Sequence, residues 1–387
     1  MVKPGKASLW VILASATLTV MAGSVISPVL NLMTEGLGVG AGSARIIITT
    51  HGIMIAICSP GIGLLIDRIG VRRPFILGLI LYGLAGGSGL IIDDYWLLIT
   101  SRILLGISVA AIFTSITVII LNLYTGDERN KVMGWRGGSN SIGGISYPLL
   151  GGFLGTFSWH LPFAAYLIGI PLAFLALITV PESQKGTVRQ VGSPISKQDS
   201  IFRIIKNTPV LFIPYVLIFL GNILLYAFVV FLPKLVEQFG ITNPFYVGIF
   251  ISAVGFVGGT TSLMYGRIRA RLSYRAIVLS ALALWAAGFT VISQAFAIWV
   301  IFFSIALFGV GMGMVMPAVL VWVGELVPAS FRGRMTSYIT TFSYTGQFLS
   351  PIILNPIASS LGLYAPFLAI GATCALFFIL FLVLLRR

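Results

Sequence analysis

Residues 61–73, GIGLLIDRIGVRR, place one acid and three arginines between two long apolar runs, residues 46–66 and 74–92. Each run has about the length of a helix that crosses a bilayer. A turn with this many charges cannot lie in hydrocarbon, so it lies at a membrane face, and its excess of arginine assigns that face to the cytoplasm. The stretch therefore predicts a membrane protein with several spans and orients the whole chain.

The composition excludes a water-soluble globular protein. Of the 387 residues, 58% are hydrophobic and 9% are charged, and the mean hydropathy is +1.04, whereas soluble domains carry about 25% charged residues. The net charge of +14 comes from short loops between apolar runs, which is typical of a membrane protein and predicts no nucleic-acid partner. Cys58 and Cys374 lie inside apolar runs without CxxC spacing, so we expect no disulfide framework and no metal site.

Runs without charged residues predict twelve transmembrane helices, and hence an all-α integral membrane fold. The single and double spans lie at residues 7–34, 46–66, 74–92, 95–124, 137–181 (two), 207–233, 238–266, 276–324 (two) and 335–385 (two). The polar stretch 182–206 is expected to be a cytoplasmic linker. The sequence therefore predicts an N-terminal six-helix bundle of residues 1–181 and a C-terminal six-helix bundle of residues 207–387.

Basic residues are distributed unevenly between the two faces that these spans define. With both termini and the even-numbered connections inside, 21 of the 24 Lys and Arg residues are cytoplasmic. Only Arg45 and Lys234 fall outside, and Arg102 lies within a span. This asymmetry predicts a multi-pass protein of the cell membrane with both termini in the cytoplasm.

The second half of the chain repeats the first at a constant offset of 203 residues. The matched pairs are Gly63 and Gly266, Arg68 and Arg271, Arg72 and Arg275, Trp96 and Trp299, Gly106 and Gly309, Arg129 and Arg332, Lys131 and Arg334, Gly143 and Gly346, and Pro148 and Pro351. Parallel repeats of this kind favour rocking of one bundle against the other around a substrate path near the midplane.

These features resemble the major facilitator superfamily over nearly the whole chain, and most closely its twelve-span drug:proton antiporter group. The loop signature Gly-x-x-x-Asp-Arg-x-Gly-x-Arg-Arg is matched by Gly63, Asp67, Arg68, Gly70, Arg72 and Arg73. Arg102 and Gly106 resemble the fourth-span motif. Pro148, Gly151 and Gly152 resemble the tail of the fifth-span antiporter motif, and Pro28 and Val29 are similar to the first-span motif.

Two positions depart from the antiporter pattern. Tyr147 stands where the fifth-span motif has glycine before its proline, and Asn31 stands where a second proline is common in the first span. These departures put export, but not the superfamily resemblance, in question.

The resemblance implies that the signature loop is a conformational latch, in which Asp67 pairs with nearby arginines and a helix N-terminus. A solvated loop carboxylate is the alternative for Asp67. At the equivalent position the second half has Ala270, and Ser273 replaces Gly70, so we expect the copy to act as a topological anchor and weaker gate.

The resemblance also links Arg102 to proton coupling. An alternative is that its side chain extends toward the outer headgroups, with Asp93 or Asp94 as counter-ion. His51 is the one group in the predicted membrane interior that titrates near neutral pH, and it is either a proton relay or a hydrogen-bonded structural residue. None of the ten carboxylates lies in the middle of a predicted span, so facilitated diffusion stays open.

In this family spans one, four, seven and ten line the substrate cavity, flanked by five, eight and eleven. The substrate-facing candidates on these spans are Phe113, Asn140, Asn222, Tyr226, Trp322, Tyr344 and Gln347, with Met312, Met314 and Met316 as apolar packing. Hydrogen bonds between helices are the alternative role of the Asn and Gln side chains.

The leading functional hypothesis is a secondary active transporter that works by alternating access and exports small apolar or weakly polar organic compounds in exchange for protons. The alternatives are a uniporter or symporter for a metabolite such as a sugar or small organic anion, and a receptor or lipid-binding scaffold. For an organic anion, only Arg102 is available as a cation within the spans. The sequence contains no catalytic constellation, so we expect no enzyme, no cofactor and a monomer whose partners are a small-molecule substrate, protons and the lipid bilayer.

Overall fold

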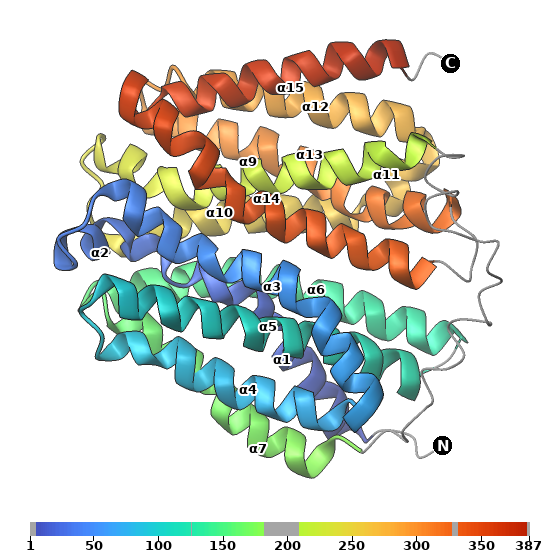
Figure 1. The fold of residues 1–387 in the computed structure, drawn as a ribbon. Helices are drawn as coiled ribbons and strands as arrows, with labels where there is room; N and C mark the ends of the chain where they lie inside the picture. Colours follow the sequence, from blue (N-terminus) through green and yellow to red (C-terminus); the bar gives the residue numbers. More distant parts are fainter. Residues whose placement is uncertain (1–4, 125, 182–208, 327–331, 385–387) are drawn as a thin grey trace. The chain divides into compact units, whose positions relative to one another are not determined.

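The structure is a computed structural model that describes residues 5–124, 126–181, 209–326 and 332–384 (Figure 1). Helices make up nearly all of this part of the chain, and it contains no β-strand. The predicted linker, residues 182–206, lies outside the described residues.

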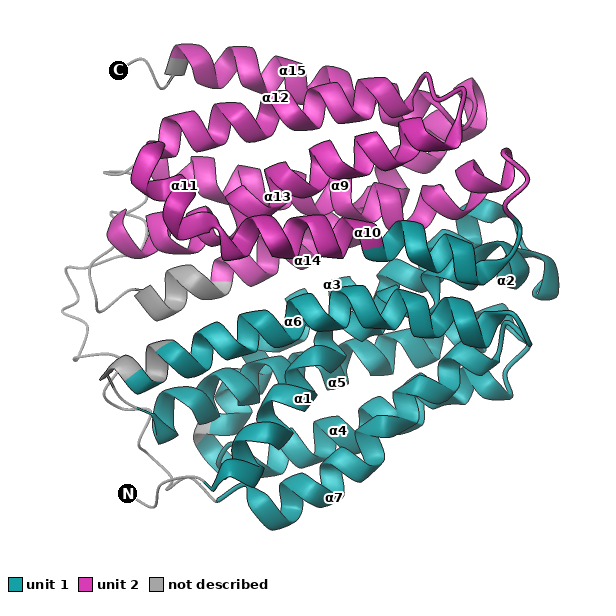
Figure 2. Cartoon of the chain, turned by 180° about the vertical axis from the view of Figure 1, so that it is seen from behind, with its two compact units in different colours: residues 1–190, 242–252 teal, residues 191–241, 253–387 magenta. Residues whose placement is uncertain are grey.

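The chain divides into two compact units, one of residues 1–190 with 242–252 and one of residues 191–241 with 253–387 (Figure 2). The first part of helix α10 (Pro244–Leu263) therefore packs within the first unit, although it follows the linker in sequence. The bundle boundaries at residues 181 and 207 stay a prediction.

The first unit contains the helices α1 (Lys6–Ser24), η1 (Ser27–Val29), α2 (Leu30–Gly36), α3 (Ala41–Ile69), α4 (Arg72–Gly87), η2 (Ser88–Leu90), α5 (Tyr95–Leu123), α6 (Gly126–Gly155), η3 (Leu161–Ile168) and α7 (Gly169–Thr179). Gly70 follows the last residue of α3 and has a φ of 85°, which ends the helix. Glycine suits this position because a residue with a side chain is strained in this conformation. Asp94 begins α5, since its carboxylate accepts a hydrogen bond from the Leu97 amide at 2.8 Å.

The second unit contains η5 (Pro209–Leu211), α9 (Phe212–Glu237), the remainder of α10, α11 (Tyr265–Arg271), α12 (Tyr274–Ile292), α13 (Ile298–Leu326), α14 (Arg332–Leu361) and α15 (Ala365–Leu384). Ser273 begins α12 by accepting a hydrogen bond from the Ala276 amide at 3.2 Å.

Ten helical segments of the described residues are long and apolar enough to cross a membrane. Two more helices, α6 and α14, have 30 residues each and carry more polar residues. A helix of this length spans about 45 Å, which exceeds the thickness of the hydrocarbon core. The predicted all-α membrane fold is confirmed, and α6 and α14 bring the number of long helical segments to the predicted twelve.

The internal repeat recurs in the packing of each unit. A Cβ placed on Gly106 of α5 would lie 2.6 Å from the Met54 side chain of α3, and one on Gly309 of α13 would lie 2.8 Å from the Val257 side chain of α10. The 203-residue offset relates Met54 to Val257 and Gly106 to Gly309, so the two contacts are equivalent. Helices two and four of each half therefore approach closely at the same place, because helix four has a glycine there.

Candidate functional site

The signature loop lies between α3 and α4, and its Arg72 makes a hydrogen bond to another helix. The Arg72 guanidinium donates to the carbonyl oxygen of Leu177, in the last turn of α7. A cation at the C-terminal end of a helix is favoured, since the carbonyls there have no partner within the helix. Arg68 and Arg73 are exposed, and the Asp67 side chain lies outside the described part of the structure. The latch role of this loop stays a prediction.

The copy of this loop in the second unit builds an aromatic cluster. The Arg269 guanidinium lies 4.0 Å from the centre of the Tyr274 ring, and that ring stacks on Trp322 with the ring centres 5.0 Å apart. Burial raises the pKa of Tyr265 to about 12, so its phenol is neutral at physiological pH. Trp322, predicted to face substrate, is 8% exposed and packs in this cluster.

Arg102 on α5 is completely buried, with 0% of its surface exposed. Its Nη2 donates to the carbonyl oxygens of Gly86 at 3.1 Å and Ala85 at 3.4 Å, both in the last turn of α4. Its Nε donates to Ser101 Oγ at 3.2 Å. The guanidinium carbon also lies 5.1 Å and 5.2 Å from the ring centres of Phe163 and Tyr166. Helix-end carbonyls and aromatic faces thus surround this cation.

The alternative in which Arg102 reaches the outer headgroups is wrong. Its side chain has no exposed surface, and the two acids considered as counter-ions have other partners. Asp94 accepts from the Leu97 amide, and Asp93 lies against His160.

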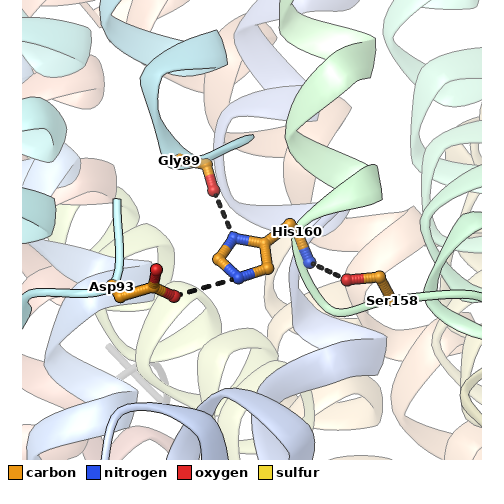
Figure 3. A network of polar contacts seen from close by, with 4 residues as sticks. All are labelled: Gly89, Asp93, Ser158 and His160. Carbon is orange, nitrogen blue, oxygen red and sulfur yellow. Dashed lines mark hydrogen bonds and ion pairs between the residues drawn. The ribbon is translucent and has the colours of Figure 1, made fainter. Parts of the chain in front are cut away.

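His160 connects two loops of the first unit, as Figure 3 shows. Its Nε2 lies 3.1 Å from Asp93 Oδ1, its Nδ1 lies 2.9 Å from the Gly89 carbonyl oxygen, and its amide donates to Ser158 Oγ at 3.3 Å. The ring stacks on Trp159 with 3.6 Å between the ring centres. The sequence gives no sign of this contact, because nothing local pairs His160 with Asp93.

Arg136 directly precedes the predicted span that begins at residue 137 and is not among the predicted substrate-facing residues. It lies on α6, about 15 Å of helix rise from the start of that helix. The Arg136 guanidinium carbon lies 4.4 Å from the centre of the Phe113 ring, and Nη1 donates to Thr117 Oγ1 at 2.8 Å. The expectation that Arg102 is the one cation available to an organic anion is therefore wrong, because Arg136 contacts the predicted substrate-facing residue Phe113. Asn140, one turn further along α6, has an Oδ1 atom without a hydrogen-bond partner among the described residues.

The antiporter-motif residues of α6 pack against two other helices of the first unit. A Cβ on Gly151 would overlap the Val25 carbonyl at the end of α1, and one on Gly152 would lie 2.5 Å from the Pro244 carbonyl oxygen of α10. The carbonyl of Pro148 lies directly against Gly248. These residues therefore allow helices to touch through their backbones.

Tyr147, which departs from the motif, makes a polar contact at the same interface. Its hydroxyl lies 2.5 Å from Thr17 Oγ1 of α1, and Thr17 Oγ1 itself donates to the Ala14 carbonyl at 2.7 Å, so Tyr147 is the donor between the two side chains. Gly143 lies one turn before Tyr147 and gives its ring room, since a Cβ there would be 3.1 Å from that ring.

Four predicted substrate-facing residues come together on two helices of the second unit. Asn222 of α9 is 3% exposed, donates to the Ile218 carbonyl at 2.8 Å and accepts from Gln347 Nε2 of α14 at 3.2 Å. Tyr226 and Tyr344 are buried on the same two helices. For Asn222 and Gln347 the structure therefore contains the hydrogen bond between helices that was the alternative to ligand contact, although Gln347 Oε1 has no hydrogen-bond partner among the described residues.

Comparison with known proteins identifies the family. The sequence profile of the Major Facilitator Superfamily matches residues 12–273 and 243–387 of the chain. The chain belongs to this superfamily. It is therefore a multi-pass transporter of the cell membrane, and the prediction of a small-molecule substrate agrees with this membership.

Two curated relatives of this facilitator are exporters. The bacillibactin exporter of Bacillus subtilis is 24% identical over 87% of this chain and 86% of its own length. The multi-drug resistance efflux pump PmrA of Streptococcus pneumoniae is 24% identical over 92% of this chain and 90% of its own. These relatives confirm the predicted resemblance to the drug antiporter group.

A solved facilitator structure has the same fold. The nucleoside transporter NupG matches 98% of this chain and 99% of its own with a TM-score of 0.77 and 12% identity. At this identity the match shows the fold alone. Superfamily members are transporters, which agrees with the prediction that the chain is not an enzyme.

Proposed function

We propose that this facilitator exports small apolar or weakly polar organic compounds in exchange for protons, by alternating access. The observation that carries the proposal is its relation to a bacillibactin exporter and a multi-drug efflux pump along most of the length of all three chains. The close backbone contacts of Pro148, Gly151 and Gly152 support it, because these residues occupy the positions of the antiporter motif.

The residues proposed to face the substrate favour a weakly polar compound. Phe113 in the first unit and Tyr226 and Tyr344 in the second are aromatic, and Asn140 and Gln347 each present an amide oxygen without a hydrogen-bond partner among the described residues. Aromatic surfaces with few polar groups suit ligands that carry one or two hydrogen-bond donors.

Proton coupling has few candidate groups in this chain. Since no carboxylate lies in the middle of a span, Arg102 and His51, both buried in the first unit, are the proposed coupling residues. The proposal includes cytoplasmic termini, in keeping with the distribution of basic residues, and a monomer.

The test is transport of fluorescent organic compounds into proteoliposomes with an imposed pH gradient. We expect accumulation that disappears when nigericin removes the gradient, together with a change of lumenal pH on substrate addition. Equal accumulation with and without the gradient would instead indicate a uniporter. Arg267→Gln, which removes an exposed charge from α11, is the control variant and should transport as the wild type does.

A small organic anion is a second candidate substrate, and Arg136 is the observation that favours it. A half-buried guanidinium held over an aromatic ring between α5 and α6 can bind a carboxylate with two parallel hydrogen bonds. Uptake of an aromatic carboxylate should then fall on the order of tenfold or more in Arg136→Gln and much less in Thr117→Val. Uptake of the aromatic carboxylate that Arg136→Gln leaves unchanged would remove this second candidate and leave the first.

A further inference from the structure

Arg102 leaves hydrogen-bond donors unused inside the first unit. Its Nε and Nη2 donate to Ser101 Oγ and to the carbonyls of Ala85 and Gly86. Its Nη1 is buried, and no acceptor among the described residues meets the distance and angle of a hydrogen bond to it. A buried donor without a partner costs about 1–3 kcal/mol, and more when the group is charged.

The positive charge of Arg102 is only partly compensated by its surroundings. No acid occurs between Glu35 and Asp67 or between Asp94 and Asp127, so the interiors of α3 and α5 contain no carboxylate. The C-terminal carbonyls of α4 correspond to about half a negative charge. The rings of Phe163 and Tyr166 and the hydroxyl groups of Tyr82 and Tyr166 complete the surroundings, and the Tyr166 hydroxyl interacts with the guanidinium. A buried cation with this environment lacks a full counter-charge.

His51 of α3 faces the same region and is also unsatisfied. It is 1% exposed, and neither ring nitrogen has a partner in hydrogen-bond geometry among the described residues, although the Ile48 carbonyl faces the ring from one turn back. The His51 carbonyl oxygen lies against Gly106, one turn after Arg102 on α5. Because side chains on a helix lean toward its N-terminus, the imidazole lies near the level of Arg102, and the two groups interact electrostatically.

At the equivalent positions of the internal repeat, the second unit lacks both residues. At the 203-residue offset, Val254 corresponds to His51 and Ile305 corresponds to Arg102, while Ser304 keeps the neighbouring Ser101. Val254 and Ile305 are buried, so the same helix contact packs without polar groups in the second unit. The first unit therefore carries both polar residues and the second carries neither, which points to a shared role.

We propose that Arg102 and His51 together bind a small inorganic anion, of which chloride is the abundant example, between α3 and α5. The anion would accept hydrogen bonds from Nη1 of Arg102 and from an imidazole nitrogen of His51. It would also supply the negative charge that the helix-end carbonyls provide only in part. A water molecule could accept these hydrogen bonds but would leave the charge uncompensated.

The test is anion binding by the purified wild-type protein without substrate or gradient, so it is independent of the proposed export. Thermal unfolding is measured while chloride replaces gluconate at constant ionic strength. A ligand that binds only the folded state stabilises it, so we expect the midpoint to rise by about 2–4 °C and to saturate. Bromide should replace chloride, and the chloride-35 resonance should broaden in a way that bromide reverses. An unfolding midpoint that does not depend on the anion would overturn the proposal and leave water at this place.

The repeat supplies a double variant that should fold, H51V with R102I, because Val254 and Ile305 pack in this arrangement in the second unit. We expect this variant to unfold cooperatively and to lose the chloride shift and the chloride-35 broadening, while Arg267→Gln keeps both. His51→Leu alone should weaken chloride binding at least tenfold. Retention of the full chloride response in the double variant would show that the anion binds elsewhere and that the assignment is wrong.

Discussion

Two arginines and one histidine of the first unit contact carbonyl oxygens at or just beyond helix ends, at three different places. Arg102 donates to carbonyls in the last turn of α4, His160 contacts the Gly89 carbonyl in the short helix that follows it, and Arg72 donates to the last turn of α7. The final carbonyls of a helix have no partner within it, and the helix dipole makes them attractive to cations. For Arg102, these contacts explain how an apolar bundle keeps a buried positive charge.

Replacing Arg102 with lysine should destabilise the protein by about 3 kcal/mol. A lysine ammonium is a compact charge and cannot contact Ser101 and the Ala85 and Gly86 carbonyls at once, as the planar guanidinium does. Thermal or denaturant unfolding in detergent measures the change. Arg267→Lys, at an exposed position, is the control, and equal stability of the two variants would contradict this account.

Replacing Gly106 with alanine should destabilise the protein by about 1–3 kcal/mol, because the new Cβ would lie 2.5 Å from the His51 carbonyl oxygen. Gly134→Ala on α6 is the matched control, since no atom lies within 4 Å of its added Cβ. That control should stabilise its helix by roughly 0.5–1 kcal/mol. Unfolding midpoints that move in the same direction for both variants would contradict the close contact of α3 and α5.

At the scale of helices, α6 joins its neighbours through a stripe of small residues with one exception. Gly143, Gly151 and Gly155 are spaced so that they face α1 and the short helix η1, and Tyr147 occupies the remaining position of that spacing. Its hydroxyl donates to Thr17, so a polar bond replaces one backbone contact. At Tyr147, which departs from the antiporter motif, α1 and α6 are therefore linked by a side-chain hydrogen bond, and on either side of it they pack through glycines.

Tyr147→Phe should weaken the joint between α1 and α6 by about 0.6–1.7 kcal/mol, the range measured for hydrogen bonds between membrane helices. The substitution keeps the ring and removes only the hydroxyl that donates to Thr17. Unfolding in detergent reports the change, and Tyr246→Phe, at an exposed position of α10, should have no effect. A Tyr147→Phe protein as stable as the wild type would show that the bond adds nothing.

At the scale of the whole molecule, Asp67→Asn should slow transport on the order of tenfold, corresponding to a coupling free energy of about 1–3 kcal/mol. The reason is the proposed latch: the amide removes the charge that would pair with arginines. Ala270→Asp places an acid in the copy of the loop and should not restore the flux. Proteoliposome flux and distance measurements between spin labels check both, and wild-type turnover with unchanged conformational populations would refute the latch.

The fold was predictable because its signals are local. A charge-free run, a proline or a charged turn marks each span within a few residues, and the repeat offset aligns the halves. The site was predictable only in part. The contacts of Phe113 with Arg136 and of Asn222 with Gln347 join different helices, and the contact of Asp93 with His160 joins two loops. No local pattern specifies such partners. A charged residue at the edge of a predicted span, such as Arg136, was the available signal.

The paired glycine contacts also restrict changes in chain length. Met54 and Gly106 are separated by the same number of residues as Val257 and Gly309, so neither copy has an insertion or deletion relative to the other within that interval. One added residue inside a helix would rotate everything beyond it by about 100° and carry the glycine away from its partner. Affinity tags and fluorescent domains should therefore not be inserted inside the helices of residues 54–106 and 257–309.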